Sequence, residues 1–218
     1  LREMGMPAPA SSLTVLEGMR RRFIPSCPTL EPWAGERAVY CGFLDEPPAL
    51  TPTPRDCVLV YLGAGSVPAG VAIRAGQELA DALGCDVYVA GVPEAVRISG
   101  GYTVACAPRF DFAELLPRAR VFVHHGGQNS MMDALSYEVP QVLVPGRVFE
   151  RQFNAEAVES ARCGLTVREP KPTLIARAAR RLVVDEPALT SGIRGLRAEL
   201  SSLGGTKRIV REVEKLVS

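Results

Sequence analysis

The chain has 218 residues, of which 47% are hydrophobic and 22% charged, and its formal net charge is +1. This length and composition suit one large domain, or one domain with an extension, that has a hydrophobic core of its own. The near-zero charge argues against a nucleic-acid or anionic-membrane surface, and no apolar run is long enough to span a bilayer, so we expect a cytoplasmic protein without a transmembrane segment or signal peptide.

The six cysteines are scattered along the chain and form no CxxC pair. They are Cys27, Cys41, Cys57, Cys85, Cys106 and Cys163. Several lie inside apolar runs typical of strands, where a thiol behaves as a small hydrophobic side chain. We therefore predict reduced, buried cysteines, and neither a disulfide framework nor a zinc site.

The first 44 residues carry little regular pattern. A serine at position 11 or 12 predicts the cap of a short helix that runs to Met19. Residues 39–44, VYCGFL, are typical of a short strand. The chain starts with Leu1 in what looks like the interior of a longer sequence, so we expect it to be a fragment.

The clearest boundary in the sequence is residues 45–56, DEPPALTPTPRD. Several prolines in so short a stretch break strands and helices and favour a stiff, extended linker. The sequence changes character after it, because residues 57–62 are almost wholly apolar, as in a parallel sheet that is covered on both faces.

Beyond the linker, apolar strands alternate with helical segments. The predicted strands are 57–62, 86–90, 102–107, 120–124, 141–144 and 165–167. The predicted helices are 67–83, 111–117, 129–137, 152–163, 172–185, 187–202 and 206–217, and Gly164 is the expected end signal of the fourth. This alternation predicts right-handed βαβ units and an α/β fold with a doubly wound, parallel, Rossmann-like sheet.

In such sheets, ligands bind outside the carboxyl ends of the strands, near the point where strand order reverses. Four loops follow predicted strands and direct attention to that edge. They are residues 63–66, 108–111, 124–130 and 145–154.

The third of these loops is the most informative. Gly126 and Gly127 separate a strand from a helix, which places backbone N–H groups and a helix dipole where an anion can sit. The only histidines, His124 and His125, precede them, and strand neighbours point to opposite faces. One of them can donate an imidazole N–H to a phosphate oxygen, and we expect His124 to point away. No third ligand is spaced to complete a metal site.

Asn129 and Ser130 fall in the first turn of the predicted helix, and Ser130 can cap the helix or bind phosphate. Asp133 lies four residues after Asn129 and therefore on the same helix face. Its carboxylate can accept hydrogen bonds from a ribose diol, or it can be an acid that the helix dipole favours. The loop at Glu150, Arg151 and Gln152 can bind sugar hydroxyls or be a solvated helix start.

Two common phosphate-binding motifs are absent from the sequence. It contains no acidic Asp-x-Asp pair in these loops to hold a divalent ion, and no GxxxxGK[ST] loop. Backbone amides and a histidine would then have to stabilise a diphosphate without metal.

The stretch HHGGQNSMMDALSYEVPQVLVPGRVFERQFNA resembles the donor-binding signature of nucleotide-sugar glycosyltransferases with the two-domain GT-B fold, which include UDP-glycosyltransferases and bacterial natural-product glycosyltransferases. Their pattern is approximately H-x-G-x-N/G-S/T-x-x-E, then G-V-P, P and D/E-Q-x-x-N-A. The resemblance extends over about residues 25–168. It implies that the chain is the C-terminal half of a GT-B fold.

The resemblance also implies roles for single residues. His125 and the amides of Gly127, Asn129 and Ser130 would hold the diphosphate, which Ser66 would approach. Asp133 would bind the ribose in place of the family's glutamate. Glu150 stands at the acidic sugar-binding position, and Arg151 or Gln152 at the neighbouring glutamine. Arg109 and Phe110 stand where the family recognises the base.

At the level of domains, the resemblance implies four segments. Residues 1–44 would end an N-terminal acceptor domain, 45–56 would be the linker, 57–203 the donor-binding domain and 204–218 a C-terminal helix. The donor would be a UDP- or dTDP-sugar, and the acceptor a small molecule or lipid. Transfer would be inverting, with no metal or cofactor.

The catalytic base of the family belongs to the N-terminal domain, so we expect no catalytic residue in this chain and no transfer by the chain alone. Three other hypotheses stay open: a donor-binding subunit of a split glycosyltransferase, a sugar-nucleotide 2-epimerase or hydrolase of the same fold, and a non-catalytic module.

Overall fold

The computed structural model describes residues 21–33, 35–63 and 67–217. The helix predicted between positions 11 or 12 and Met19 lies outside this range, as does Ser66. Among the described residues, no helix is both long and apolar enough to cross a bilayer.

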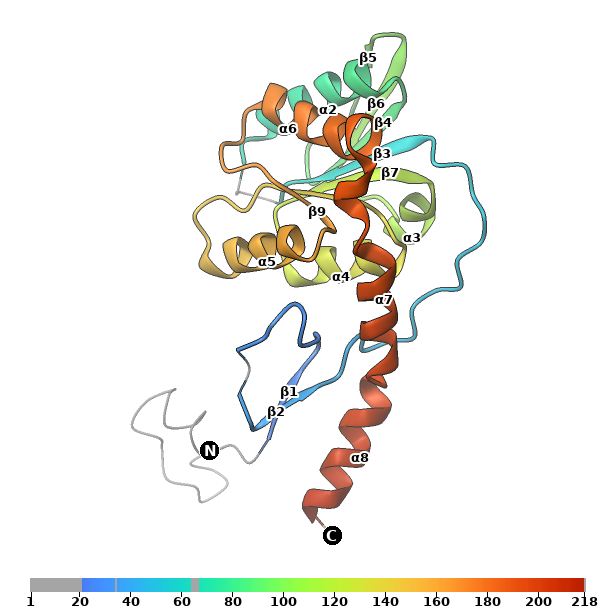
Figure 1. Cartoon of the computed structure of the whole chain (residues 1–218). Helices are drawn as coiled ribbons and strands as arrows, with labels where there is room; N and C mark the ends of the chain where they lie inside the picture. The colour runs from blue at the N-terminus through green and yellow to red at the C-terminus, as the bar shows by residue number, and fades with distance from the viewer. Residues whose placement is uncertain (1–20, 34, 64–66, 218) are drawn as a thin grey trace, which may run out of the picture.

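The core of the molecule is a seven-stranded sheet with the order β5-β6-β4-β3-β7-β8-β9 (Figure 1). Its strands are β3 (Cys57–Tyr61), β4 (Asp86–Ala90), β5 (Ala95–Ser99), β6 (Tyr102–Ala107), β7 (Ala119–His124), β8 (Gln141–Leu143) and β9 (Gly164–Thr166). All neighbours pair in parallel except β5, which is antiparallel to β6. From β3 the chain runs outward to β4 and β6, and from β7 it runs the other way to β8 and β9. The prediction of a doubly wound, parallel, Rossmann-like sheet is confirmed, apart from the edge strand β5.

The antiparallel edge strand β5 was not predicted. It pairs with β6 through a turn at Gly100 and Gly101, whose φ angles are 56° and 86°. Two central residues with positive φ are the mark of a tight hairpin turn, and glycine adopts this conformation without steric cost.

Helices cover both faces of the sheet. The helices of the described residues are α2 (Ala69–Leu83), α3 (Phe112–Leu115) with η2 (Leu116–Arg118), α4 (Gln128–Ser136), α5 (Phe149–Ser160), α6 (Pro172–Arg180) with the π-helix η3 (Arg181–Asp185), η4 (Pro187–Thr190), α7 (Ile193–Ser202) and α8 (Gly205–Val217), which extends away from the sheet. In Figure 1, α2 and α6 lie over one face, and α4 and α5 over the other. Each face has its own buried apolar cluster, so the core is a three-layer sandwich.

The helix that follows β8 differs from the prediction at both ends. It begins at Phe149, three residues before the predicted start, and ends at Ser160. Gly164 does not end it. Arg162 takes the left-handed conformation, with φ 54°, and Gly164 belongs to β9. A Cβ at Gly164 would lie 2.2 Å from the carbonyl oxygen of Gln141, so the close approach of β8 and β9 requires this glycine.

Residues 21–44 pack onto the same body. β1 (Arg22–Ile24) and β2 (Ala38–Tyr40) form a separate parallel pair. Between and after them, Cys27, Leu30 and Phe43 join the buried cluster of α4, α5 and α7. The predicted linker, residues 45–56, contains no helix or strand.

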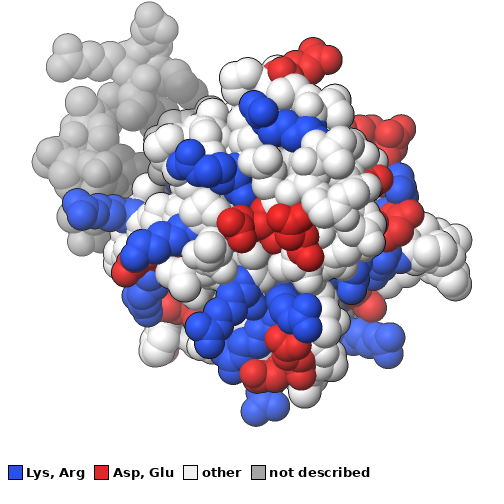
Figure 2. All heavy atoms as spheres, turned by 90° about the horizontal axis from the view of Figure 1, so that it is seen from above, with Lys and Arg blue, Asp and Glu red and all other residues white. Residues whose placement is uncertain are grey.

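All six cysteines are buried and free, as predicted. Burial raises the pKa of the thiol to about 11 in Cys27 and Cys57 and to about 12 in Cys163, so these thiols stay protonated at neutral pH. Basic and acidic side chains are interspersed over the face shown in Figure 2.

Candidate functional site

The predicted site lies where the strand order reverses. β3 and β7 are neighbours, and Tyr61 at the end of β3 pairs with His124 at the end of β7. In doubly wound sheets, the ligand crevice lies outside the carboxyl ends of two such strands. The turn from His124 to Gly127 lies at this place, between β7 and α4.

The turn is held at the peptide groups of Gly126. Its N–H donates to Nδ1 of His124 at 3.1 Å, and its carbonyl accepts from Nδ2 of Asn154 at 2.9 Å. Gly126 has φ 84°, and a Cβ there would lie 3.0 Å from the carbonyl oxygen of Arg151. The site therefore requires a glycine here both for its backbone angle and for the close approach of α5.

The two histidines diverge, as expected from their places on the strand. His124 is completely buried, and its Nε2 lies 2.9 Å from Oε1 of Gln141. Burial lowers the pKa of His124 from 6.5 to about 3, so its ring is neutral. His124 therefore belongs to the frame of the site and does not face a ligand.

His125 lies over the start of α4. Its Nδ1 is 3.4 Å from the carbonyl oxygen of Tyr61, and its ring meets the Tyr61 ring edge-on at 5.3 Å between centroids. Its Nε2 lies 2.7 Å from the position that a Cβ of Gly127 would occupy. The absence of a side chain at Gly127 thus lets the imidazole reach the helix N-terminus.

The first turn of α4 has no side-chain cap. Gly127 is the N-cap residue, and Met131 is the first residue whose N–H bonds to the carbonyl of Gly127. The amides of Gln128, Asn129 and Ser130 have no acceptor within the helix, and the helix dipole makes this end positive. Together with Nε2 of His125, these groups can bind an anion such as a phosphate.

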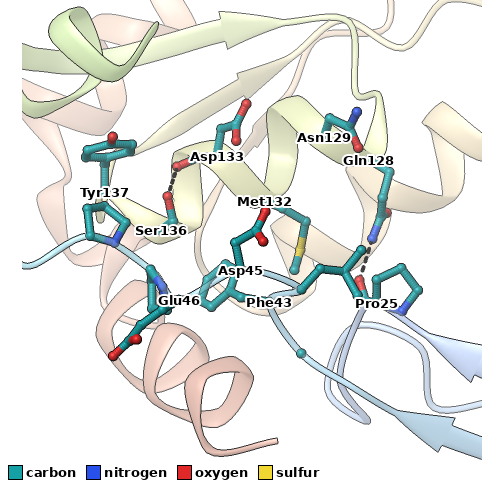
Figure 3. Close-up of a pocket in the computed structure, with 14 residues that line it drawn as sticks. Pro25, Phe43, Asp45, Glu46, Gln128, Asn129, Met132, Asp133, Ser136 and Tyr137 are labelled. Atoms are coloured by element: carbon teal, nitrogen blue, oxygen red, sulfur yellow. Dashed lines mark hydrogen bonds between the residues drawn. The ribbon is translucent and has the colours of Figure 1, made fainter. Parts of the chain in front are cut away.

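Asn129 and Asp133 share one face of α4, as the spacing predicts. In Figure 3 both side chains point away from the segment with Phe43 and Asp45, toward which Met132 points. Desolvation raises the pKa of the Asp133 carboxyl above its ordinary value. Asn129 and Asp133 also line a pocket of about 480 Å³ between α4 and residues 42–48.

The loop residues predicted to bind sugar lie in the first turn of α5, not in an irregular loop. Glu150 is exposed and Arg151 half-buried. Burial has the largest effect on the pKa of His125 and lowers it below 6.5. Both charged residues also act on this pKa: Arg151 lowers it and Glu150 raises it. Nε2 of Gln152 donates to the carbonyl of Gly146 at 2.9 Å, so Gln152 braces the loop before the helix.

The residues predicted to recognise a base follow β6, at the same sheet edge. The Phe110 ring is half-buried and meets Tyr88 edge-on at 5.4 Å, and Arg109 is exposed. The structure thus brings His125, the start of α4 and the start of α5 together. Arg109 and Phe110 follow β6, which β4 separates from β3.

Two polar residues of the site had no predicted role. Gln141 is completely buried and Asn154 is 4% exposed, and both hold the Gly126 turn, Gln141 through His124. Their positions could have indicated this role. Gln141 starts an apolar strand and Asn154 lies on the buried side of a helix, and a polar side chain at either place needs a hydrogen-bond partner in the core.

Several known proteins that are similar to this chain in sequence or fold are glycosyltransferases. Over 193 residues the chain is 27% identical to aclacinomycin-T 2-deoxy-L-fucose transferase of Streptomyces galilaeus, an alignment that covers 86% of this chain and 43% of that protein. In fold it is similar to the glycotransferase of kitacinnamycin, with a TM-score of 0.79 and 22% identity over 99% of this chain and 59% of that one.

A further similar fold is that of the glycosyltransferase SsfS6 of Streptomyces sp. SF2575, solved in complex with thymidine diphosphate. The TM-score is 0.63 and the identity 24%, over 99% of this chain and 56% of that one. The chain thus spans about half the length of the relatives it matches.

A family model described as the C-terminal domain of erythromycin biosynthesis protein CIII-like proteins matches residues 84–216, which is more than half of the chain. The chain therefore belongs to the erythromycin biosynthesis protein CIII-like C-terminal domain family, which forms the C-terminal half of glycosyltransferases with the GT-B fold.

Proposed function

We propose that this chain binds the nucleoside-diphosphate sugar donor of a glycosyltransferase, with the diphosphate at the start of α4. The observation that carries the proposal is the convergence of His125 Nε2 and the uncapped N-terminus of α4 at the switch point of the sheet. An anion there gains hydrogen bonds from groups that otherwise have no partner in the helix.

The diphosphate would contact His125, the backbone at Gly127, and the amides of Asn129 and Ser130. Ser66, which lies outside the described residues, is a further proposed contact of the diphosphate. In inverting transfer the leaving diphosphate gains charge, and fixed backbone amides and an imidazole can stabilise that charge without a divalent ion.

The nucleoside and the sugar would extend to opposite sides of the diphosphate. Asp133, one turn into α4, would accept hydrogen bonds from the ribose, and Arg109 and Phe110 would face the base. Glu150, Arg151 and Gln152 at the start of α5 would contact the sugar. The thymidine diphosphate bound to SsfS6 supports a thymidine or uridine donor.

The acceptor hydroxyl, of a small molecule or a lipid, needs a base, which we place outside this chain. His124 is buried and neutral with a pKa of about 3, and His125 is assigned to the diphosphate. The chain is therefore proposed to bind donor but not to transfer sugar alone, as the donor half of a longer enzyme or of a split one.

Calorimetry with dTDP, UDP, ADP and inorganic pyrophosphate tests the proposal directly. We expect dTDP or UDP to bind more tightly than pyrophosphate, because the nucleoside adds contacts, and ADP to bind more weakly than the better pyrimidine nucleotide. His125→Ala should weaken all four ligands. An absence of heat with every ligand at millimolar concentration would contradict a donor site.

A further inference from the structure

We infer that Gln141 is a positioning residue for the diphosphate site, although it lies in the sheet and faces no ligand. Through His124 it holds the Gly126 turn in the shape that presents the start of α4 to the crevice. This inference rests on the proposed donor site and assigns a role within it to a buried residue that would not contact the donor.

The connection is a continuous chain of hydrogen bonds in the core. Oε1 of Gln141 lies 2.9 Å from Nε2 of His124, and Nδ1 of His124 lies 3.1 Å from the backbone nitrogen of Gly126. Both side chains are completely buried. Water therefore does not compete for these bonds, and losing one leaves a buried polar group without a partner.

The direction of each bond follows from the donor at its end. The backbone N–H of Gly126 can only donate, so Nδ1 of His124 carries a lone pair. A neutral imidazole keeps one proton, which is then on Nε2 and is donated to Gln141. Gln141 thus selects the tautomer of His124 that Gly126 requires.

The orientation of the Gln141 amide is fixed by the same reasoning. If its oxygen and nitrogen were exchanged, an N–H group would face the N–H of His124. In the observed orientation Nε2 of Gln141 is buried and has no partner among the described atoms. An amide that leaves its own nitrogen unpaired in the core is more costly than an apolar side chain of the same size, which points to a need for its oxygen.

Gln141 is itself held rigidly. Its backbone pairs with Phe122 on β7 and with Gly164 on β9, and Gly164 approaches its carbonyl more closely than any side chain would permit. The oxygen that it offers to His124 is therefore fixed by three strands of the sheet.

The chain of bonds ends next to the ligand. The amide plane after Gly126 is fixed by Asn154 through the Gly126 carbonyl, and the next residue, Gly127, is the N-cap of α4. Rotation of the Gly126 peptide would move the N-cap and the following amides together. The buried side chains of His124, Gln141 and Asn154 thus fix the turn at Gly126 and Gly127, two glycines that have no side chains to hold the turn themselves.

The test is a pair of substitutions with two readouts. Gln141→Met keeps the length of the side chain and removes the acceptor, whereas Gln141→Glu keeps an acceptor. The matched control is Gln77→Met in α2, on the other face of the sheet. The readouts are the protonation pattern of the His124 ring nitrogens in ¹⁵N NMR spectra and the dTDP and UDP dissociation constants.

We expect wild-type His124 to be protonated on Nε2 alone. Gln141→Met should give a mixture of tautomers and weaken nucleotide binding by about tenfold, as for one lost buried hydrogen bond. Gln141→Glu should keep the tautomer and an affinity closer to wild type, and Gln77→Met should change neither readout.

Several outcomes would overturn the inference. A wild-type His124 protonated on Nδ1 would do so without any variant, even if Gln141→Met fails to fold. So would unchanged nucleotide affinity in a folded Gln141→Met, or lost affinity with unchanged His124 signals. If the wild-type protein binds no nucleotide, the donor site itself is wrong, while the NMR spectrum still reports on the bond between Gln141 and His124.

Discussion

The ring nitrogen Nδ1 of His124 accepts a hydrogen bond from the backbone N–H of Gly126, two residues further along the chain, at 3.1 Å. A ring that accepts at Nδ1 and donates at Nε2 cannot take a second proton without breaking this contact. Complete burial acts in the same direction, because desolvation lowers the pKa of His124 to about 3. The turn that forms the predicted diphosphate site is thus built on a histidine that must stay neutral.

The stability of the fold should therefore fall as the pH is lowered below about 6.5. In the unfolded chain, His124 has its ordinary pKa near 6.5, so its ring is protonated below that pH. In the folded protein the ring stays neutral, because its pKa is about 3. The contribution of the neutral His124 ring to the free energy of unfolding is complete above pH 6.5. Below pH 6.5 this contribution decreases by up to about 1.4 kcal/mol per pH unit. Urea unfolding between pH 7.5 and 5.5 measures the loss, in a range above the titration of ordinary carboxyl groups. In a folded His124→Gln variant the loss should be smaller, and an equal loss would contradict this assignment.

Gly126→Ala should destabilise the protein more than Gly146→Ala. Both glycines have positive φ, 84° and 63°, so both substitutions incur about 1 kcal/mol of backbone strain. Only at Gly126 does the new Cβ meet an atom, the Arg151 carbonyl oxygen at 3.0 Å, whereas Gly146 has open space. We expect Gly126→Ala to cost at least about 1 kcal/mol more in the free energy of unfolding. Equal costs would show that α5 can move away from the turn.

The sequence predicted the sheet well because its strands are short apolar runs with glycine or proline at their ends. β4 and β6 lie at the predicted bounds. The edge strand β5 was missed although a Gly-Gly pair between two apolar runs marks a hairpin. The run Val96-Arg97-Ile98-Ser99 also alternates apolar and polar residues, but Val96 and Ile98 are exposed in the structure, so β5 is an edge strand without a buried apolar face.

In the candidate site, too, some residues could be predicted from the sequence and others could not. The residues near the proposed ligand follow from a local motif, since a glycine turn and a helix start lie next to each other in the chain. The residues that hold this turn in place do not follow from a local motif. His124 bonds to Gln141, 17 residues later, and Gly126 bonds to Asn154, 28 residues later. These pairs depend on strand order and helix placement, which a local pattern does not contain. The packing of Leu30 against α4 and α7 is of the same kind.

Asp133→Asn should weaken nucleoside diphosphates and leave inorganic pyrophosphate unchanged. Asp133 lies one turn from the helix start, on the same face as Asn129, where a ribose attached to the diphosphate would reach it. Loss of a charged hydrogen-bond acceptor costs about 1.5–3 kcal/mol, or roughly ten- to a hundredfold in affinity. Calorimetry with dTDP and pyrophosphate measures both. If both ligands lose affinity equally, Asp133 acts on the phosphates through its charge or its packing and does not bind ribose.

The protonation of His125 bears on how it can bind a phosphate. Nδ1 lies 3.4 Å from the Tyr61 carbonyl, an arrangement that places a proton on Nδ1. In the neutral ring Nε2 then carries a lone pair, which repels a phosphate oxygen. Burial lowers the pKa of His125, so the free protein holds the neutral ring at pH 7.5. A hydrogen bond from Nε2 to the diphosphate requires the ring to take up a proton.

Donor binding should therefore be coupled to proton uptake and should tighten as the pH falls from about 8 to about 6. One linked proton gives at most a tenfold gain per pH unit. A nucleotide sugar is the right ligand, since its diphosphate has no terminal phosphate that titrates near pH 6. Below this range, protonation of Asp133, whose pKa is raised, opposes the gain. Calorimetry in buffers with different ionisation enthalpies counts the protons directly. We expect close to one for the wild-type protein at pH 7.5 and none for His125→Gln, and a pH-independent affinity in the wild-type protein would mean that Nε2 does not donate to the ligand.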